Sequence, residues 1–281
     1  MQITIIGLGL IGGSIARDLS TAWPHAVLTG VDGNSQHCET ALGLKLVHKV
    51  APLAEAVQLA DLVILAIPVD AIVNILPDVL DNINEVACVT DMGSTKMAII
   101  NSVKSHPKRK RFVAAHPMAG TENSGPAAAM NHLFKNRVAI ICNREESASD
   151  ALRTAELLFK QALGMRMVYM DAGAHDEQAA FISHLPHTIS YALVLAALAV
   201  GDKNGDFFEL AGGGFNSMAR LARSAAPMWE PIFCQNSKNL LEAIDAFQKK
   251  LAEFRDAVAQ QDATRLRELI SAANRIRQIL P

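Results

Sequence analysis

The chain has 281 residues, of which 50% are hydrophobic and 19% are charged, and its formal net charge at pH 7 is −2. This length predicts about two domains, and the composition excludes a disordered chain. The sequence has no basic excess and no stripe of Lys and Arg with interleaved aromatic residues. We therefore expect no nucleic-acid partner.

Several features indicate a cytoplasmic protein. The four cysteines form no CxxC pair, so we expect reduced, buried thiols and no metal site. The apolar N-terminus lacks the basic residues that begin a signal peptide. In the longest uncharged stretch, the purely apolar part covers only residues 191–200, which is too short to span a bilayer. We expect no membrane partner.

In the first two-thirds of the chain, short apolar runs alternate with segments of helical character. The apolar runs predict strands at residues 2–6, 26–31, 62–66, 86–90, 112–115, 138–141 and 165–170. The segments between the early runs predict helices at residues 12–22, 36–42, 71–80 and 96–103. This alternation predicts βαβ units and a mostly parallel sheet, buried on both faces.

The strand signals disappear after about residue 171, and helix formers dominate. One apolar seam has spacings of 4, 3, 4, 3 and 4, a period of 3.5 that is typical of a helix packed lengthwise on another helix; its members are Leu240, Ile244, Phe247, Leu251, Phe254 and Val258. The partner helix could belong to the same chain or to a second copy. Asp262 is the expected N-cap of a final helix. We predict an α/β Rossmann-type domain over residues 1–170 and an all-α domain over residues 171–281.

A glycine-rich turn follows the first predicted strand. It reads Gly7-Leu8-Gly9-Leu10-Ile11-Gly12, a GxGxxG pattern that opens a helix. Gly7 allows the tight turn, Gly9 lets the backbone approach a pyrophosphate, and Gly12 lets helix and strand pack closely. The helix N-terminus, with the amides of Leu10 and Ile11, presents free N–H groups to the phosphates. The pattern predicts a dinucleotide site.

The nature of the dinucleotide depends on Asp32, which ends the second predicted strand 20 residues after Gly12. An acid at this position binds the adenosine ribose hydroxyls and repels the 2′-phosphate of NADP. Because no Arg occurs among residues 33–36, we predict NAD rather than NADP. Ile67 and Pro68 follow the strand at 62–66 and lie at the same expected edge of the sheet.

Four polar residues stand out from their surroundings. His116 follows a predicted strand and suits an active-site loop, although a structural turn histidine fits equally well. His184 and His187 lie in the most apolar helical region, where histidines either face a site or are capped core residues. Arg220 follows the run 212–214 of glycines and is suited to bind a carboxylate, or is an ordinary surface residue.

Together these motifs resemble the prephenate/arogenate dehydrogenase family of tyrosine biosynthesis. The resemblance covers essentially the whole chain in the right order. It is carried by GLGLIGGS at residues 7–14, DMGSTK at 91–96, HPMAGTENSG at 116–125, HDEQAAFISHLPH at 175–187, GGGF at 212–215 and Pro227-Met228-Trp229. HPMAGTE and SHLPH are the specific motifs, whereas the glycine turn is shared by many dinucleotide-binding proteins.

The resemblance implies an NAD(P)-dependent oxidative decarboxylation of a cyclohexadienol that bears a ring carboxylate. Prephenate would give 4-hydroxyphenylpyruvate, and arogenate would give tyrosine. His116 matches the family histidine that accepts a hydrogen bond from the substrate hydroxyl, and Ser94 matches a serine that helps hold that hydroxyl. Arg220 matches the arginine that binds the ring carboxylate, and Glu122 matches an acid at the mouth of the site.

The family also bears on substrate choice and assembly. His187 matches a histidine that is usual in members using prephenate, which favours prephenate as the substrate. The helical domain matches the family's dimerisation domain, so we expect a homodimer. Many members read Ser-Asp-Pro after the arginine, whereas this chain has Ser224-Ala225-Ala226. This departure puts side-chain selectivity in doubt and keeps arogenate, or both substrates, as an alternative.

Two other functions fit parts of the sequence. A β-hydroxy acid dehydrogenase would need a catalytic lysine in the helical domain, where the sequence offers Lys203 and Lys238 in no convincing motif. A non-catalytic NAD-binding protein would leave His116, His187 and Arg220 without a role.

Overall fold

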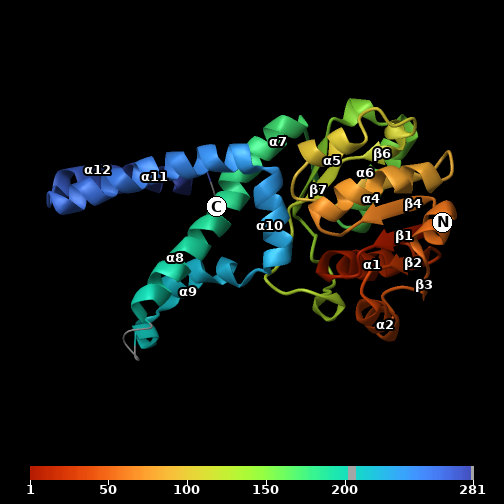
Figure 1. The fold of residues 1–281 in the computed structure, drawn as a ribbon, viewed down its shortest axis with the longest axis horizontal. Helices are drawn as coiled ribbons and strands as arrows, with labels where there is room; N and C mark the ends of the chain where they lie inside the picture. Colours follow the sequence, from red (N-terminus) through yellow and green to blue (C-terminus); the bar gives the residue numbers. More distant parts are fainter. Residues whose placement is uncertain (202–206, 280–281) are drawn as a thin grey trace. The chain divides into compact units, whose positions relative to one another are not determined.

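The computed structural model describes residues 1–201 and 207–279 (Figure 1). The chain divides into two compact units, Met1–Asn236 and Ser237–Pro281. The first unit holds the sheet and the first helices of the predicted all-α region. The predicted boundary between an α/β domain and an all-α domain, near residue 170, remains a prediction.

The centre of the first unit is a six-stranded sheet whose neighbouring strands are all parallel. In spatial order the strands are β3 (Lys49–Val50), β2 (Val27–Val31), β1 (Gln2–Ile6), β4 (Leu62–Leu65), β5 (Cys88–Asp91) and β6 (Phe112–Val113). This 3-2-1-4-5-6 order is that of the dinucleotide-binding Rossmann fold, so the predicted fold class is confirmed. The order reverses at β1, between β2 and β4.

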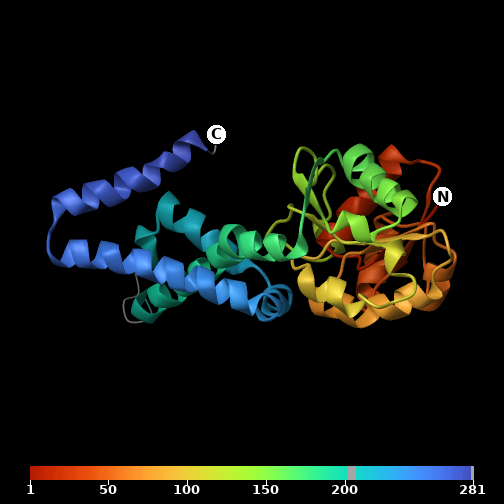
Figure 2. The same ribbon diagram turned by 90° about the horizontal axis from the view of Figure 1, so that it is seen from above.

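Helices cover both faces of this sheet (Figure 2). Strand residues alternate between the two faces, so that Ile3 and Ile5 join one hydrophobic cluster and Ile6 joins the other. The first cluster includes residues of α1 (Leu10–Ala22) and α6 (Ser149–Glu156), and the second includes residues of α4 (Val69–Asn82) and α5 (Met97–Ser102). The shorter helices α2 and α3 span Ser35–Gly43 and Leu53–Gln58.

A second, three-stranded sheet follows. It comprises β7 (Ala115–Pro117), β8 (Val138–Cys142) and β9 (Arg166–Met170), with β7 antiparallel and β9 parallel to β8. The single strand predicted at residues 112–115 is therefore wrong: it is divided between two sheets. The physical reason is at Ala115, whose N–H donates to Asp91 Oδ1 at 3.0 Å and whose carbonyl accepts from Lys96 Nζ at 2.6 Å. These side chains replace ladder hydrogen bonds, and His116 lies within β7 rather than in a loop.

A continuous helix runs from Ala172 to Gly201 through α7 (Ala172–Ala179), a π-helical segment (Ala180–His184) and α8 (Leu185–Gly201). Asp171 caps it, accepting from the amides of Gly173 and Ala174. Among the described residues it is the one helix long and apolar enough, by length and composition, to cross a membrane. The length predicted from the sequence was too short, because the prediction counted only the purely apolar residues 191–200. The first half of the helix buries His175, Asp176 and His184 inside the first unit.

The segments of the first unit that follow α8 are short. They include the 3-10 turns Phe207–Leu210 and Arg220–Arg223 and the helices α9 (Gly213–Ala219) and α10 (Ala226–Gln235). The second unit contains α11 (Ser237–Ala259), α12 (Ala263–Asn274) and the turn Arg275–Gln278. Asp262 caps α12 as expected, accepting from the Arg265 amide at 2.9 Å. The whole apolar seam lies in α11, where Leu251 and Val258 are exposed.

The missing acid before α10 leads to a testable effect on stability. Ala225 is the N-cap of α10 and has no side-chain oxygen to accept a hydrogen bond from the first turn. Ala225→Asp should therefore raise the free energy of unfolding by about 1 kcal/mol, as measured by urea denaturation. Ala225→Asn caps a helix equally well without charge and should give the same gain. An unchanged unfolding midpoint in both variants would contradict this prediction.

Candidate active site

The glycine turn after β1 forms a cradle. Gly7 has a φ of +94°, in the left-handed region, and a Cβ there would lie 2.4 Å from the Ala66 carbonyl oxygen. A Cβ on Gly12 would lie 1.9 Å from the Gly7 carbonyl oxygen, so α1 can approach β1 only with glycine at this position. The space beside Gly9 is open, with no atom within 4 Å of a built Cβ. The turn thus leaves room for a phosphate group over the N-terminus of α1.

The other predicted cofactor residues meet at this cradle. Leu10 and Ile11 form the first turn of α1. Asp32 follows β2, and its carboxylate accepts hydrogen bonds from the amides of Leu8 and Asn34, both at 2.8 Å. Ile67 and Pro68 lie between β4 and α4, and Ile67 Cγ2 would lie 2.7 Å from a Cβ on Gly7. The site is therefore at the switch point of the sheet, where such folds bind their ligands.

His116 is 6% exposed, and its ring makes one clear polar contact. Its Nδ1 lies 2.8 Å from Nε2 of His175, on α7. Burial, together with the nearby His175, Lys96 and His184, lowers the pKa of His116 well below the ordinary 6.5. The imidazole is therefore neutral at pH 7 and able to accept a proton.

A second group of predicted residues lies around α8 and the turn at Arg220. Arg220 Nη1 lies 3.4 Å from Glu122 Oε2, and both side chains are at least partly exposed. His187 stacks on Trp229 with 3.5 Å between ring centroids, and its Nδ1 donates to the Ser183 carbonyl at 3.0 Å. Burial, and secondarily the positive charge of Arg220, lowers the pKa of His187. Its Nε2 is thus an available acceptor.

Ser94 and His184 are the remaining predicted residues, and His184 lies near both His116 and His187. Ser94 is half-buried in the segment that joins β5 to α5, two residues before Lys96. His184 is fully buried, and burial lowers its pKa to about 4. Its Nδ1 lies 3.1 Å from the side-chain amide nitrogen of Asn236, so a polar side chain satisfies this nitrogen inside the core. The structure thus brings the predicted substrate and catalytic residues into one region of the first unit.

Sequence reasoning missed several buried polar residues of this region, among them Lys96, His175 and Asp176. Lys96 forms a salt bridge with Asp91, and both side chains are 0% exposed. His175 and Asp176 stood in a quoted motif without a role. A signal was present, because Asp176 precedes His184 and His187 by 8 and 11 residues, which a helix places roughly on one side.

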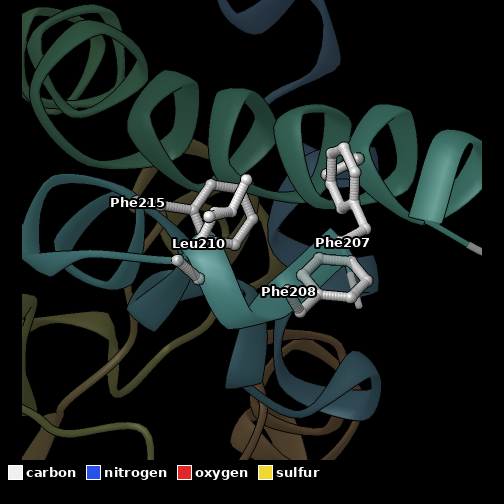
Figure 3. Close-up of a pocket in the computed structure, with 6 residues that line it drawn as sticks. Phe207, Phe208, Leu210 and Phe215 are labelled. Atoms are coloured by element: carbon white, nitrogen blue, oxygen red, sulfur yellow. The ribbon is translucent and has the colours of Figure 1, made fainter. Parts of the chain in front are cut away.

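A separate pocket of about 210 Å³ lies beside α8 (Figure 3). Phe207, Phe208, Leu210 and Phe215 line it together with Ala197 and Ala211, so it contains no titratable side chain. Its lining therefore offers no side chain for acid–base chemistry, in contrast to the region around His116.

Two other kinds of site, a metal site and a catalytic lysine, would serve other chemistries. Over residues 1–201 and 207–279, no group of three His, Cys, Asp or Glu side chains is arranged to hold a metal ion. Of the two lysines considered for a β-hydroxy acid dehydrogenase, Lys203 lies outside the described residues and Lys238 lies in α11 of the second unit.

Comparisons with known proteins agree with this geometry. The family model for the nucleotide-binding domain of prephenate dehydrogenase matches residues 15–169, and the model for its dimerization domain matches residues 171–272. A cyclohexadienyl dehydrogenase from Zymomonas mobilis is 31% identical over 99% of this chain and 96% of its own length.

Solved structures of similar proteins include a prephenate dehydrogenase from A. aeolicus in complex with hydroxyphenyl propionate and NAD+. It is 28% identical, with a TM-score of 0.91 over 100% of this chain and 98% of that one. An arogenate dehydrogenase from Synechocystis is also 28% identical, with a TM-score of 0.76 and full coverage of both chains. With both domains matched in order, this chain belongs to the prephenate dehydrogenase family.

Proposed function

We propose that this protein catalyses the NAD-dependent oxidative decarboxylation of prephenate to 4-hydroxyphenylpyruvate, a step of tyrosine biosynthesis. The observation that carries the proposal is His116, a buried and neutral imidazole on β7, within the residues that match the nucleotide-binding domain. Its environment suits a base that removes the proton of a carbinol.

The cofactor is NAD, as the sequence predicted. The chain has a nucleotide-binding domain, and its structural neighbour from A. aeolicus holds NAD+. The residues fit this group, because the open space at Gly9 admits a pyrophosphate and Asp32 presents a carboxylate at the end of β2. Bound NAD+ supplies the hydride acceptor, and the chain supplies binding, orientation and proton transfer.

His116 accepts the hydroxyl proton of the substrate as the hydride leaves the carbinol carbon. Ser94, on the adjacent segment after β5, helps hold that hydroxyl. The ring carboxylate departs as CO₂, and its bonding electron pair completes the aromatic ring. Positioning and polarisation of the hydroxyl supply most of the acceleration, because the chain adds no covalent step.

Substrate binding falls to the second group of residues. Arg220 binds the ring carboxylate, for which its planar guanidinium is suited. Glu122 lies against it at the mouth of the site, and its own backbone amide together with the Arg220 charge lowers the pKa of Glu122. The negative Glu122 orients Arg220 without entering the reaction. His187, held on Trp229, contacts the substrate through Nε2.

Prephenate and arogenate differ in the side chain that this second group faces. His187 favours prephenate, whereas Ala225-Ala226 in place of Asp-Pro keeps arogenate as the alternative. The test is NADH formation by the purified protein with each substrate, and with NAD+ and NADP+ in parallel. Faster turnover of prephenate with NAD+ is expected. A preference for arogenate would overturn the assignment of prephenate as the substrate. Tight NAD+ binding without turnover of either substrate would overturn the proposal that the protein is this enzyme.

Asp32 gives a prediction about the cofactor. In Asp32→Asn, the ribose hydroxyls lose a charged acceptor and the 2′-phosphate of NADP loses a repulsive neighbour. We expect kcat/KM for NAD+ to fall about 10-fold and the ratio of NADP+ to NAD+ use to rise. Asp61→Asn is a matched control, because Asp61 also accepts a backbone amide hydrogen bond, from Gln2, beside the same sheet. An unchanged cofactor ratio in Asp32→Asn would contradict the assignment.

We also propose a cytoplasmic homodimer formed through the helical region. The matching dimerization-domain model supports this assembly. So do apolar side chains left exposed on several elements, among them Leu195, Leu210 and Leu251. Four free cysteines fit a reducing compartment. The prediction that all four are buried is wrong, because Cys38 is half-buried and Cys234 is exposed. Sedimentation equilibrium tests the assembly, and a monomer at micromolar concentration would refute it.

A further inference from the structure

His175 and Asp176 connect the proposed base to a buried carboxylate. They are 1% and 3% exposed and lie near the start of α7. Nε2 of His175 lies 2.8 Å from His116 Nδ1, and Nδ1 of His175 lies 2.8 Å from Asp176 Oδ1. Asp176, His175 and His116 therefore form an unbroken line of short hydrogen bonds, which we call the relay.

The carboxylate end of the relay is fixed by the backbone. Asp176 Oδ1 accepts from the Lys96 amide at 2.8 Å, and Oδ2 accepts from the Met97 amide at 2.9 Å. Burial alone would raise the pKa of Asp176, but the hydrogen bonds from His175 and the two amides outweigh it and lower the pKa. Asp176 is thus ionised and can only accept hydrogen bonds.

This end determines where the protons of the relay lie. Because Asp176 only accepts, Nδ1 of His175 carries a proton. In neutral His175, Nε2 is then an acceptor, and His116 must donate to it from Nδ1. The Nε2 of His116 is left with a lone pair, which is the form that can take a proton from a substrate hydroxyl.

The relay also bears on the charge that proton transfer creates. A cation on His116 would lie in a buried site beside the positive Lys96, which disfavours it. If Nε2 of His116 gains a proton, its Nδ1 proton can pass to Nε2 of His175. The positive charge then rests on His175, in contact with the negative Asp176, and His116 stays neutral.

We propose that His175 and Asp176 are positioning residues of the reaction: they hold His116 in its Nδ1–H form, and His175 takes the positive charge, stabilised by Asp176, when His116 takes the substrate proton. The proposal rests on the proposed function of His116 as the base. Asp176 thus influences the proton transfer at His116 through His175, without contacting His116 itself.

The experiment compares Asp176→Asn and His175→Gln with wild type in steady-state NADH formation from prephenate, or from arogenate if that is the substrate found. We expect kcat to fall about 10²-fold or more in both variants, with KM and the Kd for NAD+ changed less than threefold. Folding is checked by Tm and by NAD+ binding. Asp171→Asn is the matched control: it keeps the cap of the same helix, since Asn caps as well as Asp, and should retain wild-type kcat.

The pH profile separates this function from a structural one. The charged or titratable groups around His116 are His175 and Asp176 from α7, Lys96 and Asp91 from the β5–α5 region, and His184. Of these, Asp176→Asn removes the carboxylate that stabilises the protonated His116–His175 pair. The acid limb of kcat/KM should therefore move to lower pH.

Two outcomes would overturn the proposal. One is a kcat for Asp176→Asn and His175→Gln close to that of Asp171→Asn. The other is activity lost only in proportion to folded protein, with an unmoved acid limb. His116→Asn, assayed beside them, keeps the two hypotheses apart. If His116→Asn is active, the base assignment fails, and if only the relay variants are active, the relay alone fails.

Discussion

His116→Asn should lower kcat about 10³-fold while KM and NAD+ binding stay near wild-type values. The reason is that His116 accepts a proton only in the transition state, so its loss acts on the barrier more than on binding. Asn occupies less space than His and has no basic nitrogen. Steady-state kinetics and NAD+ titration measure the two effects separately. A rise in KM with unchanged kcat would show that His116 binds substrate and is not the base.

The control for this variant is His132→Asn. His132 has a φ of +61°, which Asn adopts readily, and its side chain is exposed and outside the site. The same chemical change there should leave kcat unaltered. Loss of activity in both variants would point to a general effect of the substitution.

The pH dependence of the wild-type enzyme follows from the same residue. His116 works as a neutral base, so activity is present above its pKa and is lost as pH falls through it. Burial and the neighbouring groups lower that pKa, which places the acid limb of kcat/KM below 6.5. An acid limb above pH 6.5 that disappears in His116→Asn would contradict the environment described for this imidazole.

Much of the Rossmann unit was predictable from local pattern. Strands buried on both faces read as continuous apolar runs, and the glycine turn with Asp32 marked the switch point. The division of residues 112–117 between two sheets was not predictable. It depends on Asp91 and Lys96, which are distant in sequence from Ala115 and replace its ladder hydrogen bonds.

The candidate site was predictable to a similar degree. His116, Arg220 and His187 stood out because polar residues in apolar or glycine-rich surroundings need an explanation. The contact between His116 and His175 joins residues 59 positions apart. No periodicity links a strand residue to a helix residue at that distance, so the relay required the structure.

Lys96→Met should destabilise the protein by about 3–5 kcal/mol, because it leaves the buried Asp91 carboxylate without its counter-charge. Both side chains are 0% exposed, and Lys96 Nζ also donates to the Ala115 carbonyl. Urea denaturation measures the loss, which is a large part of the total stability of a typical domain. Lys96 immediately precedes α5, and Lys104 is an exposed lysine two residues after the end of α5. Lys104→Met should change the free energy of unfolding by less than about 0.5 kcal/mol.

The double variant Lys96→Met/Asp91→Asn tests the cause. If the cost comes from an unpaired buried charge, neutralising Asp91 should recover part of the loss, so the two effects are not additive. Additive losses would indicate that the two residues act independently. The pair also holds both backbone polar groups of Ala115, the residue before His116. Lys96→Met should therefore lower kcat as well as stability, since the ion pair that secures the fold also aligns the strand carrying the base.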